Sequence, residues 1–126
     1  MEKLKNKTVL IVDDDDRNIF ALRSYLEMLD MNVARAGDGQ QAISLLQNDA
    51  RPDVILLDMM MPLMDGYETL GILKQDALLK QIPVIAVTAK AMKGDRERCM
   101  EAGAWDYVSK PIDMKALVDK ITKWII

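Results

Sequence analysis

The chain of 126 residues contains no histidine. Ser-His-Asp and Cys-His nucleophilic catalysis both need an imidazole, and so do the common zinc sites with histidine ligands, so these classes of site are excluded. A role as a phosphohistidine carrier is excluded for the same reason. Any chemistry in this chain therefore depends on carboxylates, lysines and hydroxyl groups.

Cysteine and long apolar runs are scarce as well. Cys99 is the only cysteine, which excludes an internal disulfide and a Cys-rich metal site, and we expect it to be a buried structural thiol. The apolar runs are too short for a membrane span or a secretory signal. We therefore expect a soluble cytoplasmic domain that makes no membrane contact.

Positive charge is not in excess, because 17 Lys and Arg residues stand against 20 Asp and Glu residues, for a net charge of -3. The charges are spread along the chain, and the one concentrated group is the acidic run at 13–16. This distribution argues against nucleic-acid binding. The length predicts a single domain over residues 1–126, with a loose N-terminal segment at 1–6.

Apolar runs of strand length alternate with helical patterns five times along the chain. We predict strands near 7–12, 32–36, 53–57, 83–88 and 105–109. Helices are predicted to begin near residues 39 and 66, because Asp38 and Asp65 each open a capping-box sequence. Gly103 is predicted to end the fourth helix, and Asp113 to cap the start of the fifth.

The strand patterns also predict how the sheet is ordered. The first, third and fourth strands are nearly continuous Val, Ile and Leu, as in strands covered on both faces, whereas 32–36 alternates like an edge strand. With right-handed crossovers this predicts an α/β fold, a flavodoxin-like doubly wound five-stranded parallel sheet in the order 2-1-3-4-5 with five helices. Ligands bind such sheets outside the carboxyl ends of the strands.

Polar side chains stand at those carboxyl ends. They are Asp13 and Asp14 after the first strand, Asp58 after the third, Thr88 after the fourth and Lys110 after the fifth. Clustered carboxylates repel one another, so the three Asp residues predict a bound cation, and Mg²⁺ suits so few ligands better than Ca²⁺ does. Asp58 is then placed as a nucleophile that takes a phosphoryl group, with Lys110 neutralising charge and the Thr88 hydroxyl donating to a phosphoryl oxygen.

Nearly the whole chain, from about Lys3 to Ile126, resembles the receiver domain of bacterial two-component response regulators. Four motifs carry the resemblance, and they are Val12-Asp13-Asp14-Asp15, the segment 57–66 around Asp58, Val87-Thr88-Ala89 and Ser109-Lys110-Pro111. The segments 16–22 and 88–97 are most similar to receivers at the C-terminal end of hybrid sensor histidine kinases.

The resemblance implies that Asp58 accepts a phosphoryl group from a partner phosphohistidine. The ligands it implies for Mg²⁺ are Asp13, Asp14, Asp58 and the backbone carbonyl of Met60. The groups it implies for contact with the phosphoryl group are Thr88, Lys110 and the backbone of Ala89, with a cis bond before Pro111. Asp15 and Asp16 match no essential position and are expected to cap the first helix.

The resemblance also implies a switch and a partner. Thr88 and Tyr107, expected at the same level of adjacent strands, would change the face formed by the fourth helix, fifth strand and fifth helix. The implied partner is a sensor histidine kinase or a histidine phosphotransfer protein, and the domain is a monomer or weak dimer and a signalling phosphoacceptor, not an enzyme. The chain departs from the commonest family pattern at Met60 and at Lys90.

Two other function classes compete with this interpretation. A flavodoxin-like, Mg²⁺-dependent phosphatase or phosphotransferase would also use an Asp nucleophile, but it needs a substrate cap, and Met60 breaks the haloacid-dehalogenase pattern. A degenerate receiver or a flavin carrier would be a pure binding module. Flavin phosphate favours a Ser/Thr/Gly-rich loop after the first strand, where this chain has four carboxylates.

Overall fold

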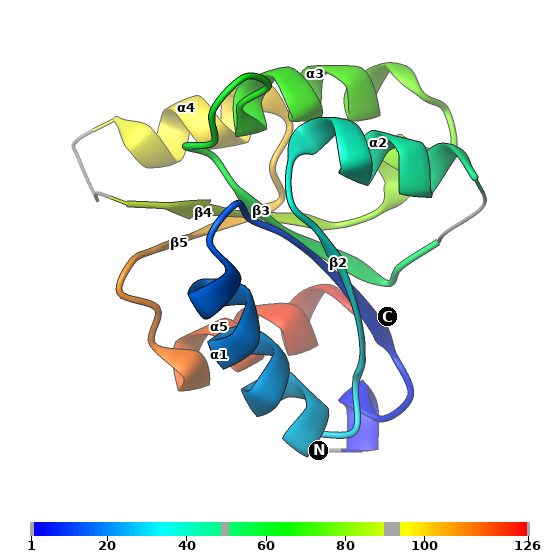
Figure 1. The fold of residues 1–126 in the computed structure, drawn as a ribbon, viewed down its shortest axis with the longest axis vertical. Helices are drawn as coiled ribbons and strands as arrows, with labels where there is room; N and C mark the ends of the chain where they lie inside the picture. The colour runs from blue at the N-terminus through cyan, green and yellow to red at the C-terminus, as the bar shows by residue number, and fades with distance from the viewer. Residues whose placement is uncertain (1, 49–50, 90–93, 126) are drawn as a thin grey trace.

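The computed structural model describes residues 2–48, 51–89 and 94–125, which form a parallel sheet with helices on both faces (Figure 1). The strands are β1 (Thr8–Val12), β2 (Asn32–Ala36), β3 (Val54–Asp58), β4 (Val84–Thr88) and β5 (Asp106–Ser109). The helices are α1 (Asp16–Met28), α2 (Gly39–Gln47), α3 (Gly66–Gln75), α4 (Asp95–Ala102) and α5 (Met114–Trp124), with short 3-10 helices η1 (Glu2–Leu4) and η2 (Leu79–Gln81). No helix in these ranges is long and apolar enough to cross a membrane.

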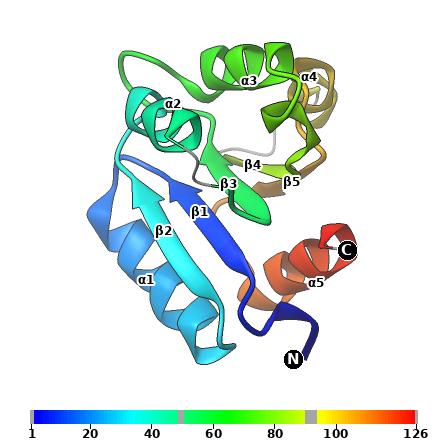
Figure 2. The ribbon, with the colours of Figure 1, turned by 90° about the vertical axis from the view of Figure 1, so that its right-hand side faces the viewer.

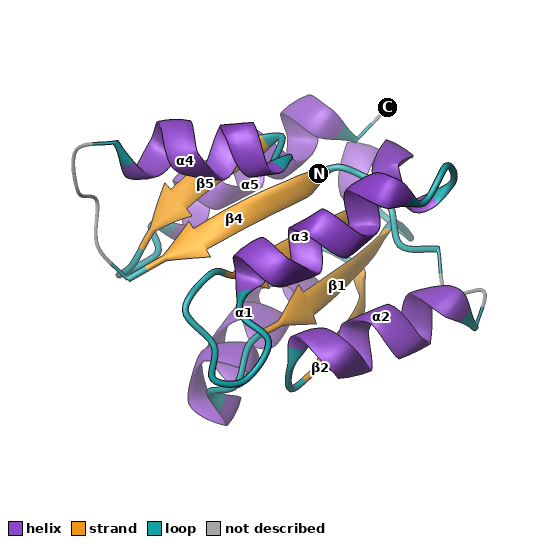
Figure 3. Cartoon of the chain, turned by 90° about the horizontal axis from the view of Figure 1, so that it is seen from above, coloured by secondary structure: helices purple, strands orange, loops and turns teal. Residues whose placement is uncertain are grey.

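The strand order is β2-β1-β3-β4-β5 and every pairing is parallel, which confirms the predicted doubly wound, flavodoxin-like topology. Helices α1 and α5 cover one face of the sheet, and α2, α3 and α4 cover the other (Figure 2). The arrowheads of the strands point to one common edge (Figure 3). Because β1 and β3 are neighbouring parallel strands, their carboxyl ends lie next to each other at that edge.

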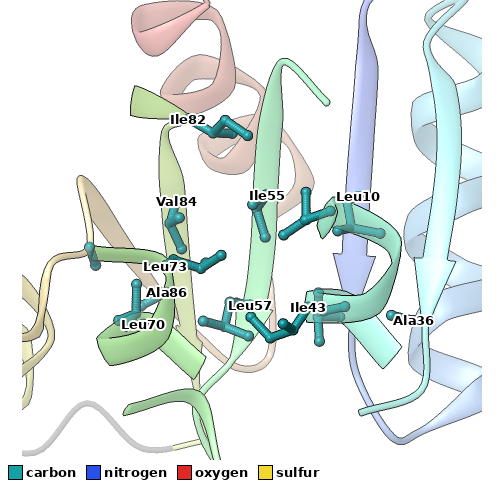
Figure 4. Packing of buried hydrophobic residues seen from close by; sticks show 14 of the residues in the cluster. Leu10, Ala36, Ile43, Ile55, Leu57, Leu70, Leu73, Ile82, Val84 and Ala86 are labelled. Atoms are coloured by element: carbon teal, nitrogen blue, oxygen red, sulfur yellow. The ribbon is translucent and has the colours of Figure 1, made fainter. Parts of the chain in front are cut away.

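The central strands are buried on both faces, as their apolar runs predict. All five residues of β3 and all five of β4 are buried. Successive side chains of a strand point to opposite faces, so Leu10 joins the cluster under α2 and α3, while Ile11 joins the cluster under α1 and α5. Figure 4 shows the first cluster, which includes Ile55 and Leu57 of β3 and Leu70 of α3. The two clusters pack against opposite faces of the sheet and so hold its carboxyl edge in place.

The helix ends follow the predicted capping residues. Asp38 accepts a hydrogen bond from the Gln41 amide at 2.8 Å, and Asp65 accepts one from the Glu68 amide at 2.9 Å. Asp113 caps α5 in the same way, and Gly103 follows α4 with a positive φ of 118°. Each side-chain cap satisfies an amide that has no partner inside its own helix, which explains why the helices begin where the sequence predicts.

Two residues of the segment that we expected to be loose, 1–6, make contacts with the rest of the domain. Leu4 is fully buried among residues of α1 and α5, and the Asn6 amide donates to the Asp30 carbonyl at 2.8 Å. The sequence did not indicate this packing because Leu4 is a lone apolar residue among charged and polar neighbours, with no periodicity to mark a buried face.

Candidate functional site

Three carboxylates meet at the carboxyl edge of the sheet. Asp13 follows β1, Asp14 lies beside it on the loop to α1, and Asp58 ends the neighbouring strand β3. One oxygen from each carboxylate lies within 4.8 Å of the other two. Asp13 and Asp58 are each only 3% exposed, whereas Asp14 is exposed. Convergent carboxylate oxygens at one point fit a hard divalent cation, as the sequence predicts for Mg²⁺.

The acceptor candidate Asp58 is electrostatically unusual. Burial raises the pKa of Asp58 above its ordinary value of 3.8, and the nearby carboxylates of Asp13 and Asp14 raise it as well. The Met60 amide, which donates to Oδ1 of Asp58 at 3.0 Å, and Lys110 oppose part of this rise. The surroundings of Asp58 therefore destabilise its charged form, and a bound cation would offset that destabilisation.

Lys110 brings a positive charge into the cluster from the end of β5. Its Nζ lies 3.5 Å from Oδ2 of Asp58 and 3.7 Å from Oδ2 of Asp13. The Lys110 amide donates to the Thr88 carbonyl at 2.7 Å, which ties this loop to the end of β4. The peptide bond between Lys110 and Pro111 is cis, in agreement with the resemblance.

Thr88 and Ala89 stand at the end of β4, beside the acceptor strand. The register pairs Asp58 with Val87, so buried Thr88 is one residue further along, and Ala89 is exposed. Both residues line a cavity of about 330 Å³ whose other wall includes Asp95 and Arg98 of α4. The cavity also borders Met59 and Met60, the two residues that follow Asp58.

Tyr107 does not lie at the same level as Thr88, contrary to the expectation from the sequence. The register of β4 and β5 pairs Thr88 with Ser109 and Tyr107 with Ala86. Residues 107 and 109 point to the same face of the sheet, because side chains two apart on a strand do so. Tyr107 therefore lies on the same face as the residue opposite Thr88, but two residues earlier on β5. The Tyr107 side chain is half-buried and lines a second cavity, of about 400 Å³, together with Arg96 of α4 and Lys120 of α5.

The other two carboxylates of the acidic run have structural partners. Asp15 is the N-cap of α1, and its Oδ1 accepts from the Arg17 amide at 2.9 Å, a bond that is the main cause of the lowered pKa of Asp15. Asp16 forms an ion pair with Arg35 of β2. Asp15 therefore caps α1, as expected, whereas the contact of Asp16 ties α1 to β2. Lys90, at which the sequence departs from the commonest family pattern, lies outside the described residues.

One contact of the site was missed by the sequence reasoning. Asn18 of α1 donates from Nδ2 to Oδ2 of Asp13 at 2.6 Å, and the Asp15 amide donates to Oδ1 of Asp13 at 2.9 Å. The available signal was an amide side chain in the first turn of a helix that begins just after the acidic run. That signal is weak because Asn is also common in loops and caps.

The chain is similar to known proteins over most of its length. The family model described as response regulator receiver domain matches residues 9–122. The polar-differentiation response regulator DivK of Brucella anthropi is 40% identical over 119 residues, which cover 94% of this chain and 96% of DivK. These matches do not favour the alternative of a metabolite phosphatase.

Two solved structures have the same fold. The receiver domain of the sensor histidine kinase PA1611 from Pseudomonas aeruginosa, described with a magnesium ion coordinated in its active-site cleft, has a TM-score of 0.86 and 33% identity, covering 95% of this chain and 98% of that one. The second is the co-crystal structure of the histidine phosphotransfer protein Ypd1 and the receiver domain of its downstream response regulator Ssk1, from Saccharomyces cerevisiae. It has a TM-score of 0.87 and 26% identity, and the match covers 97% of this chain and 90% of that one.

Proposed function

Since this chain belongs to the response regulator receiver family, we propose that Asp58 is its phosphoryl acceptor in a two-component phosphorelay. A receiver domain is a signalling phosphoacceptor rather than an enzyme with a substrate of its own. The observation that carries the proposal is the position of buried Asp58, with two further carboxylates within 4.8 Å and the Lys110 ammonium at 3.5 Å. A nucleophilic carboxylate, a metal-binding cluster and a charge-neutralising lysine are the parts that phosphoryl transfer to an aspartate requires.

Receiver domains bind Mg²⁺ at an acidic cluster, and in this chain the residues that would hold it are Asp13, Asp14, Asp58 and the carbonyl of Met60. The ion, when bound, supplies positive charge to the transferring group. The chemistry of the donor set supports the assignment, because Mg²⁺ takes a few carboxylate oxygens and completes its shell with water and phosphate oxygens.

In the transfer step a carboxylate oxygen of Asp58 attacks the phosphorus atom of a phosphohistidine. The new P–O bond forms as the P–N bond breaks, and the imidazole nitrogen leaves with the electron pair. Lys110 offsets the charge on the phosphoryl oxygens, and the Thr88 hydroxyl and the Ala89 amide donate to them. The product is an acyl phosphate on Asp58.

Receiver domains interact with histidine kinases or phosphotransfer proteins, and we assign a partner of this kind to the acidic edge. Two exposed apolar side chains belong to the segments that follow the acidic residues, since Phe20 of α1 is 72% exposed and Leu63 of the loop before α3 is 97% exposed. A partner that docks at this edge would cover them. We expect the exchange to take place in the cytoplasm and the domain to work there as a monomer or weak dimer.

The same site supports a switch that the phosphoryl group controls. Thr88, drawn toward the new phosphoryl oxygens, would leave space beside β5 into which Tyr107 can turn. The cavity between Tyr107, Arg96 and Lys120 lies on the face formed by α4, β5 and α5, so a change of the Tyr107 rotamer would alter a surface that a partner can read.

Incubation with acetyl phosphate and Mg²⁺ tests the proposed function. Intact-protein mass spectrometry should find one added phosphoryl group that hydroxylamine removes, and EDTA should prevent its addition. The Asp58→Asn variant should gain no group, while the matched variant Asp119→Asn, which alters an exposed carboxylate on α5, should behave as the parent protein does. A phosphoryl group that persists in Asp58→Asn would show that the acceptor is another residue.

A further inference from the structure

The two carboxylates that follow β1 are held very differently. Both oxygens of Asp13 accept a hydrogen bond from the chain, Oδ1 from the Asp15 amide at 2.9 Å and Oδ2 from the Asn18 side chain at 2.6 Å. Asp14 is exposed, and within the described ranges no hydrogen bond to its carboxylate is found. The orientation of Asp13 is therefore fixed by the protein itself, whereas that of Asp14 is not.

We propose that Asn18 is a positioning residue for phosphoryl transfer. Its amide orients the Asp13 carboxylate toward the point where Asp14 and Asp58 converge, so that Asp13 is ready for the hydrated Mg²⁺ before the ion arrives. The proposal rests on the function assigned above, because it gives Asn18 a role in that same site. Asn18 does not touch the phosphoryl group or Asp58, and it acts through Asp13.

The geometry supports this role because each carboxylate oxygen can accept more than one bond. Each oxygen of Asp13 has two lone-pair positions, of which the chain occupies one. Lys110 approaches Oδ2 only to 3.7 Å, so this oxygen is shared between a close neutral donor from α1 and a more distant cation that follows β5. The remaining lone pairs of Asp13 are directed by these contacts and stay available to a metal-bound water.

The type of residue supports the role as well. An amide holds a carboxylate without changing the net charge of the cluster, so it does not compete with a divalent cation as a lysine or arginine at this position would. The neighbouring cation Arg17 has a side chain that is 94% exposed and pairs with Asp15, away from Asp13. The first turn of α1 thus turns a neutral donor toward Asp13 and its positive charge toward solvent.

Hydrogen-bond partners of metal ligands commonly change metal affinity by 10- to 100-fold when they are removed. We therefore expect Asn18→Ala to raise the Mg²⁺ dissociation constant about 10-fold in a titration followed by the amide signals of residues 13–18 and 58–60. The side-chain carboxyl carbon signal of Asp13 in the metal-free protein should also move. Asn18→Leu, which keeps nearly the shape of Asn but cannot donate, should behave as Asn18→Ala does.

The matched control is Ser24→Ala, at an exposed position of the same helix, which should bind Mg²⁺ as the parent protein does. In a protein that already carries Asp13→Ala, the further change Asn18→Ala should weaken Mg²⁺ binding no more, because the acceptor of its bond is gone. A purely structural role of Asn18 predicts something else: a lower melting temperature with an unchanged Mg²⁺ affinity. That result would overturn the proposal.

The failure of this proposal can be told apart from a failure of the proposed function. If Asp14→Asn weakens Mg²⁺ binding and Asn18→Ala does not, the metal site stands and the positioning role falls. If Asp58→Asn still accepts a phosphoryl group, the proposed function falls whatever the Mg²⁺ titrations show. The titrations need no phosphoryl donor, so the two outcomes are read independently.

Discussion

Lys110 and Asp58, from the ends of two different strands, place Nζ and Oδ2 3.5 Å apart. The strand between them, β4, contributes Thr88 to the same edge of the sheet. A cation held this close to a buried carboxylate offsets part of the charge that the cluster of acids accumulates. This pair is the part of the site in which the roles of charge balance and of phosphoryl transfer can be separated by experiment.

Lys110→Ala should leave the fold intact and slow phosphorylation. Lys110 is only partly buried, with 27% of its side chain exposed, so its removal opens little of the core. Removal of one group that stabilises developing negative charge in a transition state costs roughly 100-fold or more in rate in enzymes, and we expect a loss of that order here. Initial rates of phosphorylation by acetyl phosphate measure this, with exposed Lys115→Ala as the control. Rates equal to those of the parent protein would remove Lys110 from the reaction.

Asp58 should make the metal-free protein less stable as the pH rises. Burial, followed by the carboxylates around it, holds the pKa of Asp58 in the folded protein above 3.8. The folded state therefore keeps its proton to higher pH than the unfolded state, so the contribution of Asp58 to stability is fully present below pH 3.8 and is lost as the pH rises through the raised pKa.

Denaturant unfolding in EDTA over a pH series measures this effect. The advantage in stability of Asp58→Asn over the parent protein should be larger at neutral pH than below pH 3.8. Added Mg²⁺ should stabilise the parent protein more than the variant, because it offsets the charge that the variant lacks. An advantage that shrinks as the pH rises would contradict the account.

The switch predicts distant changes on activation. Beryllofluoride, which mimics a phosphoryl group, should shift the amide signals of residues near 13–18 and 58–66 and also those of β5 and α5. Tyr107→Ala should abolish the shifts in α5 while those around Asp58 persist. Shifts confined to the acidic edge, with 94–124 silent, would mean that Tyr107 stays fixed and that partners contact only the acidic edge.

Leu4→Ala tests whether the N-terminal segment is part of the folded domain. Leu4 is 0% exposed, and truncation of such a side chain typically costs about 2–5 kcal/mol of unfolding free energy. Met28→Ala, at a position 78% exposed, should change the unfolding free energy by less than about 0.5 kcal/mol. Equal stabilities of the two variants would support the loose segment that the sequence suggested.

Most of the fold and the composition of the site are readable from the sequence for one physical reason. Buried parallel strands must be apolar along their whole length, so a polar residue such as Asp58 marks a strand's end, and those ends converge in a doubly wound sheet. The caps at Asp38, Asp65 and Asp113 are readable because a helix N-terminus needs a short polar side chain.

The remaining features depend on tertiary packing that periodicity does not record. The register of β4 and β5 sets Tyr107 opposite Ala86, but the sequence 105–109 has no strict alternation from which that offset follows. The bond from Asn18 to Asp13 depends on how α1 leaves the sheet, and the burial of Leu4 on how α1 and α5 close over it. These are contacts between elements, so they emerge only when the elements are placed in space.

The central claim is that Asp58 carries the phosphoryl group, and chemical mapping tests it most directly. Borohydride reduces an acyl phosphate to the alcohol and leaves free carboxylates unchanged, so a phosphorylated aspartate becomes homoserine. After incubation with acetyl phosphate and Mg²⁺, reduction and tandem mass spectrometry should find homoserine at position 58, and none at that position without Mg²⁺. Homoserine at 13, 14 or another aspartate, with position 58 unchanged in protein shown to be phosphorylated, would contradict the account.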